Sequence, residues 1–369
     1  SELLQKKLNK ISEIHSHFLV HKKVFTSKLW SRDDKTVNYE QSDENEEYLL
    51  TLSSFHQKKD KIIDLCINKE QALLIVVLLK VSFLGRGKLF RATLDKSYNI
   101  FSDCDKIYEI INTNRIEYIV NFAAQAMVAQ SWESPEDWYM TNVVSQVKLH
   151  DRIRKLPFVR KYIHVTTPEV YGNTNGWLKE NFNFKPSTPY AVSRAACDLH
   201  LMSFFKAYDF PVVFTRAANV YGPCQQLYRI IPKAILSARL GNKINLHGGG
   251  TSVRSFIHMD DVSDATLKIA LDGKPGETYH ISTNETISIK ELVENICEIT
   301  KVQFNDLVLM TGDRLGKDQS YLLNTDKLRG NLNWTNKIKL KEGLLDTLFW
   351  IDDNIKELKN LPSEYIHKK

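Results

Sequence analysis

Apolar stretches alternate with amphipathic ones through the middle of the chain. Apolar runs of strand length occupy 72–79, 116–124, 162–167 and 211–220, and longer stretches with helical spacing separate them. Strands that alternate with helices are typical of a parallel sheet covered by helices on both faces. The pattern therefore predicts a doubly wound α/β domain over residues 71–250.

The two ends of the chain depart from this alternation. Near the start, apolar side chains recur at helical spacing among lysines, and the polar segment 31–47 follows. We therefore expect residues 1–70 to form a helical and linker extension. After residue 250, helices predicted over 262–271 and 340–358 indicate a smaller mixed α/β lobe, 251–369, interleaved with the core.

Composition narrows the class of protein. The 369 residues are 43% hydrophobic and 25% charged, as in an ordinary globular protein. The longest apolar run is far shorter than the roughly 20 residues that cross a bilayer, and the start lacks a secretory signal pattern. The five cysteines are isolated, without the spacing of a metal site. We expect a cytoplasmic protein with no metal and no membrane span.

The charge is weakly basic. The formal net charge is +6, and the basic residues are spread along the chain without a basic tract. A nucleic-acid partner is therefore not expected, whereas a small ligand that carries phosphate is compatible with this charge.

A tyrosine and an arginine four residues apart begin a helical stretch after a Pro-Ser-Thr-Pro turn. The spacing places Tyr190 and Arg194 on one helix face. A phenol titrates near pH 10, so a tyrosine that acts as a base near neutrality needs a cation beside it. Arg194 could supply that cation, although the same spacing also occurs on many helices without a site.

A second group of polar residues follows the apolar run 162–167. Thr167 and Glu169 come where this predicted strand ends, and ligands of parallel sheets bind at the carboxyl edge. A threonine hydroxyl can bond a substrate oxygen, and a carboxylate can remove a proton from carbon. Turn chemistry alone would also explain these residues.

Further candidates lie along the chain. The apolar run 116–124 ends in Ala123 and Ala124, and Gln125 follows it. Small residues at the end of a strand let a flat cofactor approach the backbone. Close packing explains them equally well. A nucleotide diphosphate could be bound by four polar residues: Asn219, Arg254, Arg314 and Lys317. Solvated surface positions would show the same residue types.

These motifs occur in a specific order. The order is N-F-A-A-Q, T-x-E-V-Y-G, P-S-x-P-Y-x-x-x-basic, R-x-x-N-V-Y-G-P, V-R-S-F-I-H-x-D-D and G-D-R-x-G-x-D. Over about residues 99–358 the chain resembles the extended short-chain dehydrogenase/reductases that act on nucleotide sugars. The resemblance is greatest to the 4,6-dehydratases of the dTDP-glucose type.

The resemblance implies a Rossmann-like NAD-binding core, a C-terminal substrate lobe, a nucleotide-diphosphate sugar as substrate and a homodimer. Thr167, Tyr190 and Arg194 would form the hydride-transfer triad, and Glu169 would be the base at C5. The sugar would be oxidised at C4, lose water across C5 and C6, and receive the hydride back at C6. Two sets of ligands are implied: for the cofactor Gly85, Gly87, Ala123, Ala124, Gln125, Tyr190 and Arg194; for the substrate Asn219, Arg254, Arg314 and Lys317.

Three positions depart from the family pattern. Arg194 replaces the usual lysine, Pro168 replaces the acid that commonly precedes the glutamate, and Gly85 and Gly87 form a G-x-G without its third glycine. Two alternatives to a dehydratase therefore stay open. One is an epimerase or decarboxylase of the same fold, and the other is a degenerate member that serves as a structural or accessory subunit of a larger assembly.

Overall fold

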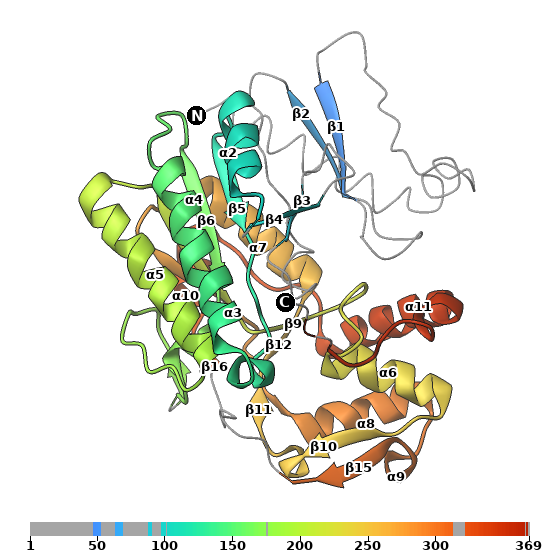
Figure 1. The fold of residues 1–369 in the computed structure, drawn as a ribbon. Helices are drawn as coiled ribbons and strands as arrows, with labels where there is room; N and C mark the ends of the chain where they lie inside the picture. The colour runs from blue at the N-terminus through green and yellow to red at the C-terminus, as the bar shows by residue number, and fades with distance from the viewer. Residues whose placement is uncertain are drawn as a thin grey trace.

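The computed structural model in Figure 1 describes most of the chain beyond residue 97 and three short segments before it. The described residues are 47–52, 63–68, 88–90, 97–100, 102–174, 176–312, 322–365 and 367.

A four-stranded parallel sheet forms the centre of the main domain. Its order is β13-β8-β6-β5, and all neighbouring strands run parallel. The strands are β5 (Tyr118–Asn121), β6 (Lys161–Thr166), β8 (Val212–Ala217) and β13 (Thr278–Ile281). Three of the four predicted apolar runs thus form neighbouring strands, and their carboxyl ends share one edge. The fourth run, 72–79, lies outside the described residues.

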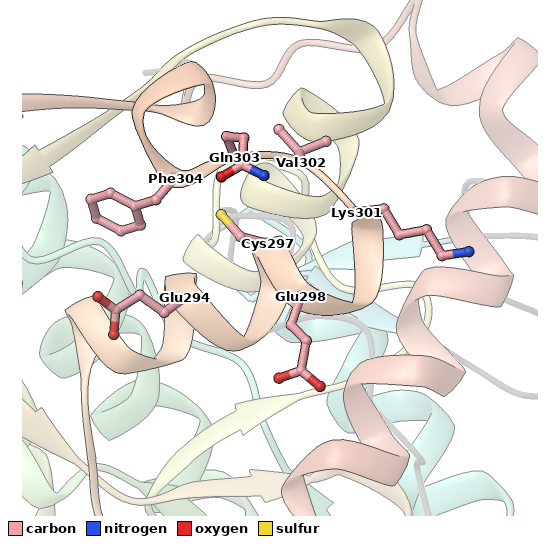
Figure 2. A pocket seen from close by; sticks show the side chains of 7 residues that line it. All are labelled: Glu294, Cys297, Glu298, Lys301, Val302, Gln303 and Phe304. Carbon is pink, nitrogen blue, oxygen red and sulfur yellow. The ribbon is translucent and has the colours of Figure 1, made fainter.

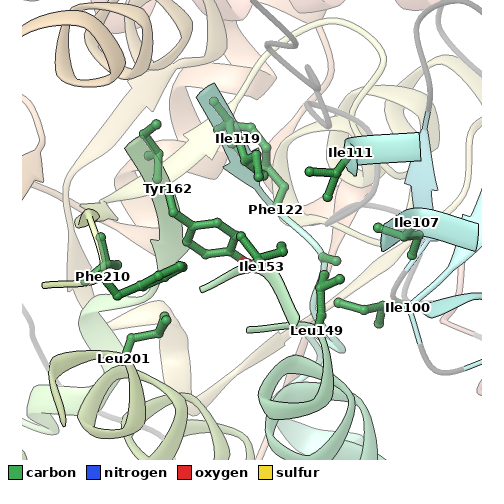
Figure 3. Packing of buried hydrophobic residues seen from close by; sticks show 14 of the residues in the cluster. Ile100, Ile107, Ile111, Ile119, Phe122, Leu149, Ile153, Tyr162, Leu201 and Phe210 are labelled. Carbon is green, nitrogen blue, oxygen red and sulfur yellow. The ribbon is translucent and has the colours of Figure 1, made fainter. Parts of the chain in front are cut away.

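Helices cover both faces of this sheet. Successive side chains of a strand point to opposite faces, so Val212 and Phe214 lie in one apolar cluster and Val213 in another. The first cluster, shown in Figure 3, includes residues of three helices: α2 (Cys104–Thr113), α4 (Ser145–Ile153) and α5 (Pro189–Tyr208). The second includes residues of α7 (Met259–Asp272). The predicted doubly wound α/β class is confirmed.

The first described strands do not join this sheet. β1 (Glu47–Leu52) pairs antiparallel with β2 (Ile63–Asn68), and β3 (Lys88–Phe90) pairs antiparallel with β4 (Ser97–Asn99). The predicted helical and linker extension over 1–70 therefore contains a strand pair that we did not predict. The six-residue runs EYLLTL and IDLCIN lack the strict alternation that identifies a strand by periodicity.

A smaller lobe surrounds a third apolar cluster. Three helices contact one another there, and the parallel pair β10–β15 lies beside them. These elements are α6 (Ile230–Leu240), β10 (Ile244–His247), α8 (Ile289–Thr300), β15 (Val308–Thr311) and α11 (Leu340–Leu358). Because α6 precedes residue 250 and β13 follows it, lobe and core are interleaved along the chain. The predicted helices over 262–271 and 340–358 are present as α7 and α11.

The remaining short elements connect these layers. They are η2 (Ala129–Trp132), α3 (Pro135–Tyr139), η3 (Met140–Val144), η4 (Pro168–Tyr171), β7 (Trp177–Leu178), β9 (Asn219–Tyr221), η5 (Gly248–Gly250), β11 (Val253–Arg254), β12 (Phe256–His258), β14 (Ile287–Ser288), α9 (Phe304–Leu307), β16 (Leu322–Leu323) and α10 (Asp326–Leu332). Within the described part of the chain, no helix combines the length and apolar character that crossing a bilayer requires.

Candidate active site

Thr167, Glu169 and Tyr190 meet where β6 ends and α5 begins. Thr167 follows β6 directly, and its hydroxyl accepts a hydrogen bond from the Glu169 backbone N–H at 3.3 Å. Thr188 caps α5 by accepting from the Ala191 N–H at 3.2 Å, which places Tyr190 in the first helical turn. The Tyr190 side chain is buried and hydrogen-bonds Thr167.

The environment of Tyr190 favours the neutral phenol. Burial raises its pKa above the usual value of 10.0, and the nearby Glu169 carboxylate raises it further. The charges of Arg194 and Arg229 and the hydrogen bond from Thr167 lower this pKa, but they do not outweigh burial. Arg194 thus acts in the direction that the sequence predicted, but it is not sufficient to make this phenol acidic.

Arg194 lies beneath the site and is only 1% exposed. Its Nη2 donates to the Val165 backbone carbonyl and lies 3.5 Å from His164 Nε2. Its Nε and Nη1 have no hydrogen-bond partner among the described residues. Buried guanidinium donors are rarely left unpaired, and both atoms are covered by the surrounding protein in this structure.

A buried charge network supports the strand ends from below. Arg216 on β8 donates to Asp198 Oδ2 at 2.9 Å and to the Tyr171 hydroxyl at 2.5 Å. Burial alone would raise the pKa of Asp198, but the hydrogen bond from His164 and the charge of Arg216 hold it below its usual range. Tyr171 in turn contacts His280 Nε2 at 2.9 Å. This network fixes α5 to β6, β8 and β13.

The loop after β5 is fastened to the start of α5. The Gln125 N–H donates to Asn142 Oδ1 at 2.7 Å, and Asn142 Nδ2 donates to Ser193 Oγ at 2.9 Å. The Tyr190 N–H donates to Ser131 Oγ at 3.2 Å. The small side chains in this loop, Ala123 and Ala124, are buried. The loop is therefore held beside the phenol.

The pairing of β9 with β12 brings two predicted substrate residues together. β9 pairs in parallel with β12, and the Asn219 N–H donates to the Ser255 carbonyl at 3.1 Å. Arg254 directly precedes Ser255; it is buried, and its Nη1 donates to the Val253 carbonyl at 2.8 Å. The four other predicted ligands lie outside the described residues: Gly85, Gly87, Arg314 and Lys317.

The structure adds one basic residue that the sequence did not single out. Arg229 begins α6, its charge lowers the pKa of Tyr190, and its buried Nε has no partner among the described residues. Its guanidinium also faces the ring of Tyr228 at 5.6 Å. No motif marked Arg229, because only the tertiary fold brings the start of α6 near Tyr190.

A surface hollow on the lobe is a separate feature. Figure 2 shows its lining side chains, which come from the end of α8 and the segment that continues into α9. Glu294 and Glu298 place two carboxylates there with one lysine, Lys301. This charge balance does not suit a diphosphate, so the sheet edge is the candidate active site.

Comparison with known proteins assigns the chain. The family model for GDP-mannose 4,6 dehydratase matches residues 93–347. Human dTDP-D-glucose 4,6-dehydratase is 33% identical over 258 residues, which cover 68% of this chain and 73% of the human protein. The bovine dTDP-D-glucose 4,6-dehydratase is 34% identical over 257 residues, or 68% of this chain and 72% of its own.

Solved structures agree with this assignment. A dTDP-glucose 4,6-dehydratase from Streptomyces venezuelae with NAD bound has a TM-score of 0.66 and 28% identity, covering 70% of this chain and 79% of its own. A UDP-glucose 4-epimerase from Thermotoga maritima has a TM-score of 0.65 and 27% identity, covering 69% of this chain and 83% of its own. The G-x-G at Gly85 and Gly87 lies before the residues that the family model matches. The chain belongs to the GDP-mannose 4,6-dehydratase family of extended short-chain dehydrogenase/reductases.

Proposed function

We propose that the protein is an NAD-dependent nucleotide-sugar 4,6-dehydratase. The observation that carries the proposal is the convergence of a hydroxyl, a carboxylate and a buried phenol, Thr167, Glu169 and Tyr190, at the carboxyl edge of a parallel sheet. These groups supply the hydrogen bond, the carbon base and the hydroxyl base that such a reaction needs.

The residues at this edge are compatible with NAD. Ala123 and Ala124 have no side chain beyond Cβ to keep a flat cofactor from the backbone after β5, and Arg194 places a positive charge near Tyr190. When bound, NAD would accept a hydride from the sugar and return it. Gln125 would complete this side of the site.

The chain's own residues would divide the proton transfers between them. Tyr190 takes the proton of the sugar hydroxyl at C4, and Thr167 holds the oxygen. The resulting ketone acidifies the C5 proton, which Glu169 removes. The C6 hydroxyl then leaves as water on a proton from solvent, because Pro168 cannot donate one. Arg254, Asn219 and Arg229 would hold the nucleotide diphosphate, since guanidinium groups form the bidentate bonds that phosphate accepts. Arg314 and Lys317 remain predicted ligands of the same group.

An epimerase is the second candidate. Pro168 is buried beside Thr167 and cannot donate a proton to a leaving hydroxyl, whereas epimerisation at C4 needs no such donor. The similarity to the Thermotoga epimerase is compatible with this alternative. Analysis of the product separates the two, because a 4-epimer retains the water that a dehydratase removes.

Two variants test the proposed roles separately. Tyr190→Phe should reduce the rate of NADH formation with substrate by roughly 10²- to 10⁴-fold, because the hydroxyl base is lost. Glu169→Gln should still form NADH but release no 4-keto-6-deoxy sugar. Tyr208→Phe, whose side chain is 54% exposed at the end of α5, is the matched control and should react like the wild type. Full product formation by Glu169→Gln would refute the proposal.

The assembly and compartment belong to the same proposal. Four apolar side chains are exposed along η3 and α5, two elements that contact each other: Met140, Val144, Val192 and Leu199. We propose that this face joins two copies of the chain.

A cytoplasmic location, expected from the isolated cysteines, remains a prediction.

A further inference from the structure

The segment that follows α11 folds back onto the candidate active site. We call residues 361–365 together with His367 the return segment. Its Glu364 forms an ion pair with Lys233 on α6. The ring of Tyr365 packs edge-on against Tyr228, with centroids 5.4 Å apart. The return segment thus lies beside the N-terminal end of α6, next to the position of Arg229.

A chain of hydrogen bonds leads from the return segment to Gln125. His367 Nε2 lies 2.7 Å from Asp137 Oδ2, and His367 Nδ1 lies 3.2 Å from the Tyr365 hydroxyl. The Gln125 side chain donates from Nε2 to that hydroxyl at 2.6 Å. The His367 ring also stacks on Trp138, with centroids 5.1 Å apart.

The members of this chain are close enough to satisfy one another. Gln125 Nε2 also lies 3.3 Å from His367 Nδ1, so the carboxamide contacts both side chains of the return segment. With the imidazole proton on Nε2, His367 donates to the Asp137 carboxylate and Nδ1 accepts the Tyr365 proton. The Tyr365 oxygen accepts from the Gln125 amide. Gln125 is 4% exposed, and its backbone N–H is bonded to Asn142. Its side chain is therefore fixed from a segment 240 residues away.

We propose that Tyr365 and His367 are positioning residues that hold the Gln125 carboxamide in one orientation in the site. This inference rests on the proposed function, in which Gln125 lines the cofactor side. A glutamine side chain has three rotatable bonds, and fixing it before ligand binding removes an entropy cost from the binding step. Asp137 and Trp138 hold the imidazole, so α3 and the return segment form one support for the loop after β5.

The first measurement follows the loop in the ligand-free protein. Tyr365→Phe keeps the ring on Tyr228 but removes the hydroxyl, and should increase hydrogen–deuterium exchange over residues 121–130. The matched control, Glu364→Gln, removes only the ion pair with Lys233 and should leave this exchange unchanged. Equal exchange in Tyr365→Phe and the wild type would overturn the inference.

The second measurement is NAD affinity by calorimetry. Tyr365→Phe and His367→Phe should each weaken binding by about three- to tenfold, the effect of one lost hydrogen bond. In a Gln125→Ala background, Tyr365→Phe should have no further effect. An equal loss in both backgrounds would show a general structural role and overturn the inference. If Tyr365→Phe increases the exchange but the wild-type protein binds no NAD, the proposed function fails and the positioning of Gln125 stands.

Discussion

At the scale of single residues, the groups around Tyr190 shift its pKa in opposite directions. Burial and the Glu169 carboxylate raise its pKa, while Arg194, Thr167 and Arg229 lower it. Deprotonation of this phenol therefore depends on charges that a ligand adds or removes. Arg194 is the first of the groups that lower this pKa, and its guanidinium is buried with the Val165 carbonyl as a hydrogen-bond partner.

Two substitutions should shift the pKa of Tyr190 in opposite directions. Glu169→Gln removes a negative charge and should lower this pKa, whereas Arg194→Met removes a positive charge and should raise it. The measurement is an ultraviolet titration of tyrosinate, taken as the difference between each protein and the same protein carrying Tyr190→Phe. Shifts of the same sign in both variants would contradict this description of the site.

The buried histidines should make the fold sensitive to acid. Burial lowers the pKa of His164 to about 4 and that of His280 to about 3, below the ordinary 6.5. Their contribution to stability is therefore complete above about pH 6.5 and is lost as the pH falls toward these values. His280 Nδ1 contacts the Asn324 carbonyl and Nε2 contacts Tyr171, whose oxygen accepts from Arg216, so the ring is held neutral.

This sensitivity is measurable by urea unfolding. Between about pH 6.5 and about pH 5 each of these two histidines should remove roughly 2 kcal/mol from the free energy of unfolding, at 1.36 kcal/mol per pH unit. A His280→Gln variant should show a shallower dependence on pH over the same range. An unfolding free energy that stays constant between these pH values would contradict the assignment of neutral buried rings.

At the scale of elements, α11 positions the strand that carries Asn219. A Cβ added at Gly343 would lie 2.2 Å from the Tyr221 hydroxyl and 2.9 Å from His258 Cδ2. α11 therefore approaches β9 and β12 more closely than any side chain at residue 343 permits. The lobe's face of the site depends on this contact.

Gly343→Ala should consequently lower the free energy of unfolding by about 1–3 kcal/mol, the usual cost of overpacking. The matched control is Gly330→Ala in α10, where an added Cβ meets no atom within 4 Å. Alanine should there stabilise the helix by up to about 1 kcal/mol. Denaturant unfolding compares the two, and equal effects would contradict the packing of α11.

The sequence was sufficient to predict the elements whose signal is local. β6 and α5 were predicted because an apolar run ends at Thr167 and a helical spacing starts at Tyr190. The pair β1–β2 was missed, because its short runs have no periodicity that separates strand from linker. Asn142, Arg229 and Tyr365 were missed for a different reason. Their roles arise from tertiary contacts, the last across 240 residues, which no local pattern encodes.

At the scale of the whole molecule, we propose that two parts of the fold contribute residues to one site. In this proposal the end of β6 and the start of α5 contribute Thr167, Glu169 and Tyr190, and the pairing of β9 with β12 contributes Asn219 and Arg254. The buried network around Arg216 and the packing of α11 hold these two sets in place. The family model matches residues 93–347 and leaves residues 1–92 unmatched.

The exposed apolar face predicts how copies of the chain associate. Val144 and Leu199 are each 51% exposed on neighbouring elements. Leu199→Glu should place a charge in the proposed interface and convert a dimer to a monomer, while Phe349→Glu, at a 62% exposed position on α11, should not. Light scattering during size-exclusion chromatography reports the mass, and an unchanged mass for Leu199→Glu would remove this face as the interface.

The central claim is that this chain dehydrates a nucleotide sugar with NAD. Its most direct test is mass spectrometry of the products after the purified protein is incubated with NAD and, in separate reactions, dTDP-glucose, UDP-glucose and GDP-mannose. The account predicts that one of these substrates yields a 4-keto-6-deoxy product lighter by one water molecule, and that Tyr190→Phe yields none. Recovery of all three unchanged, or of a 4-epimer with unchanged mass, would contradict it.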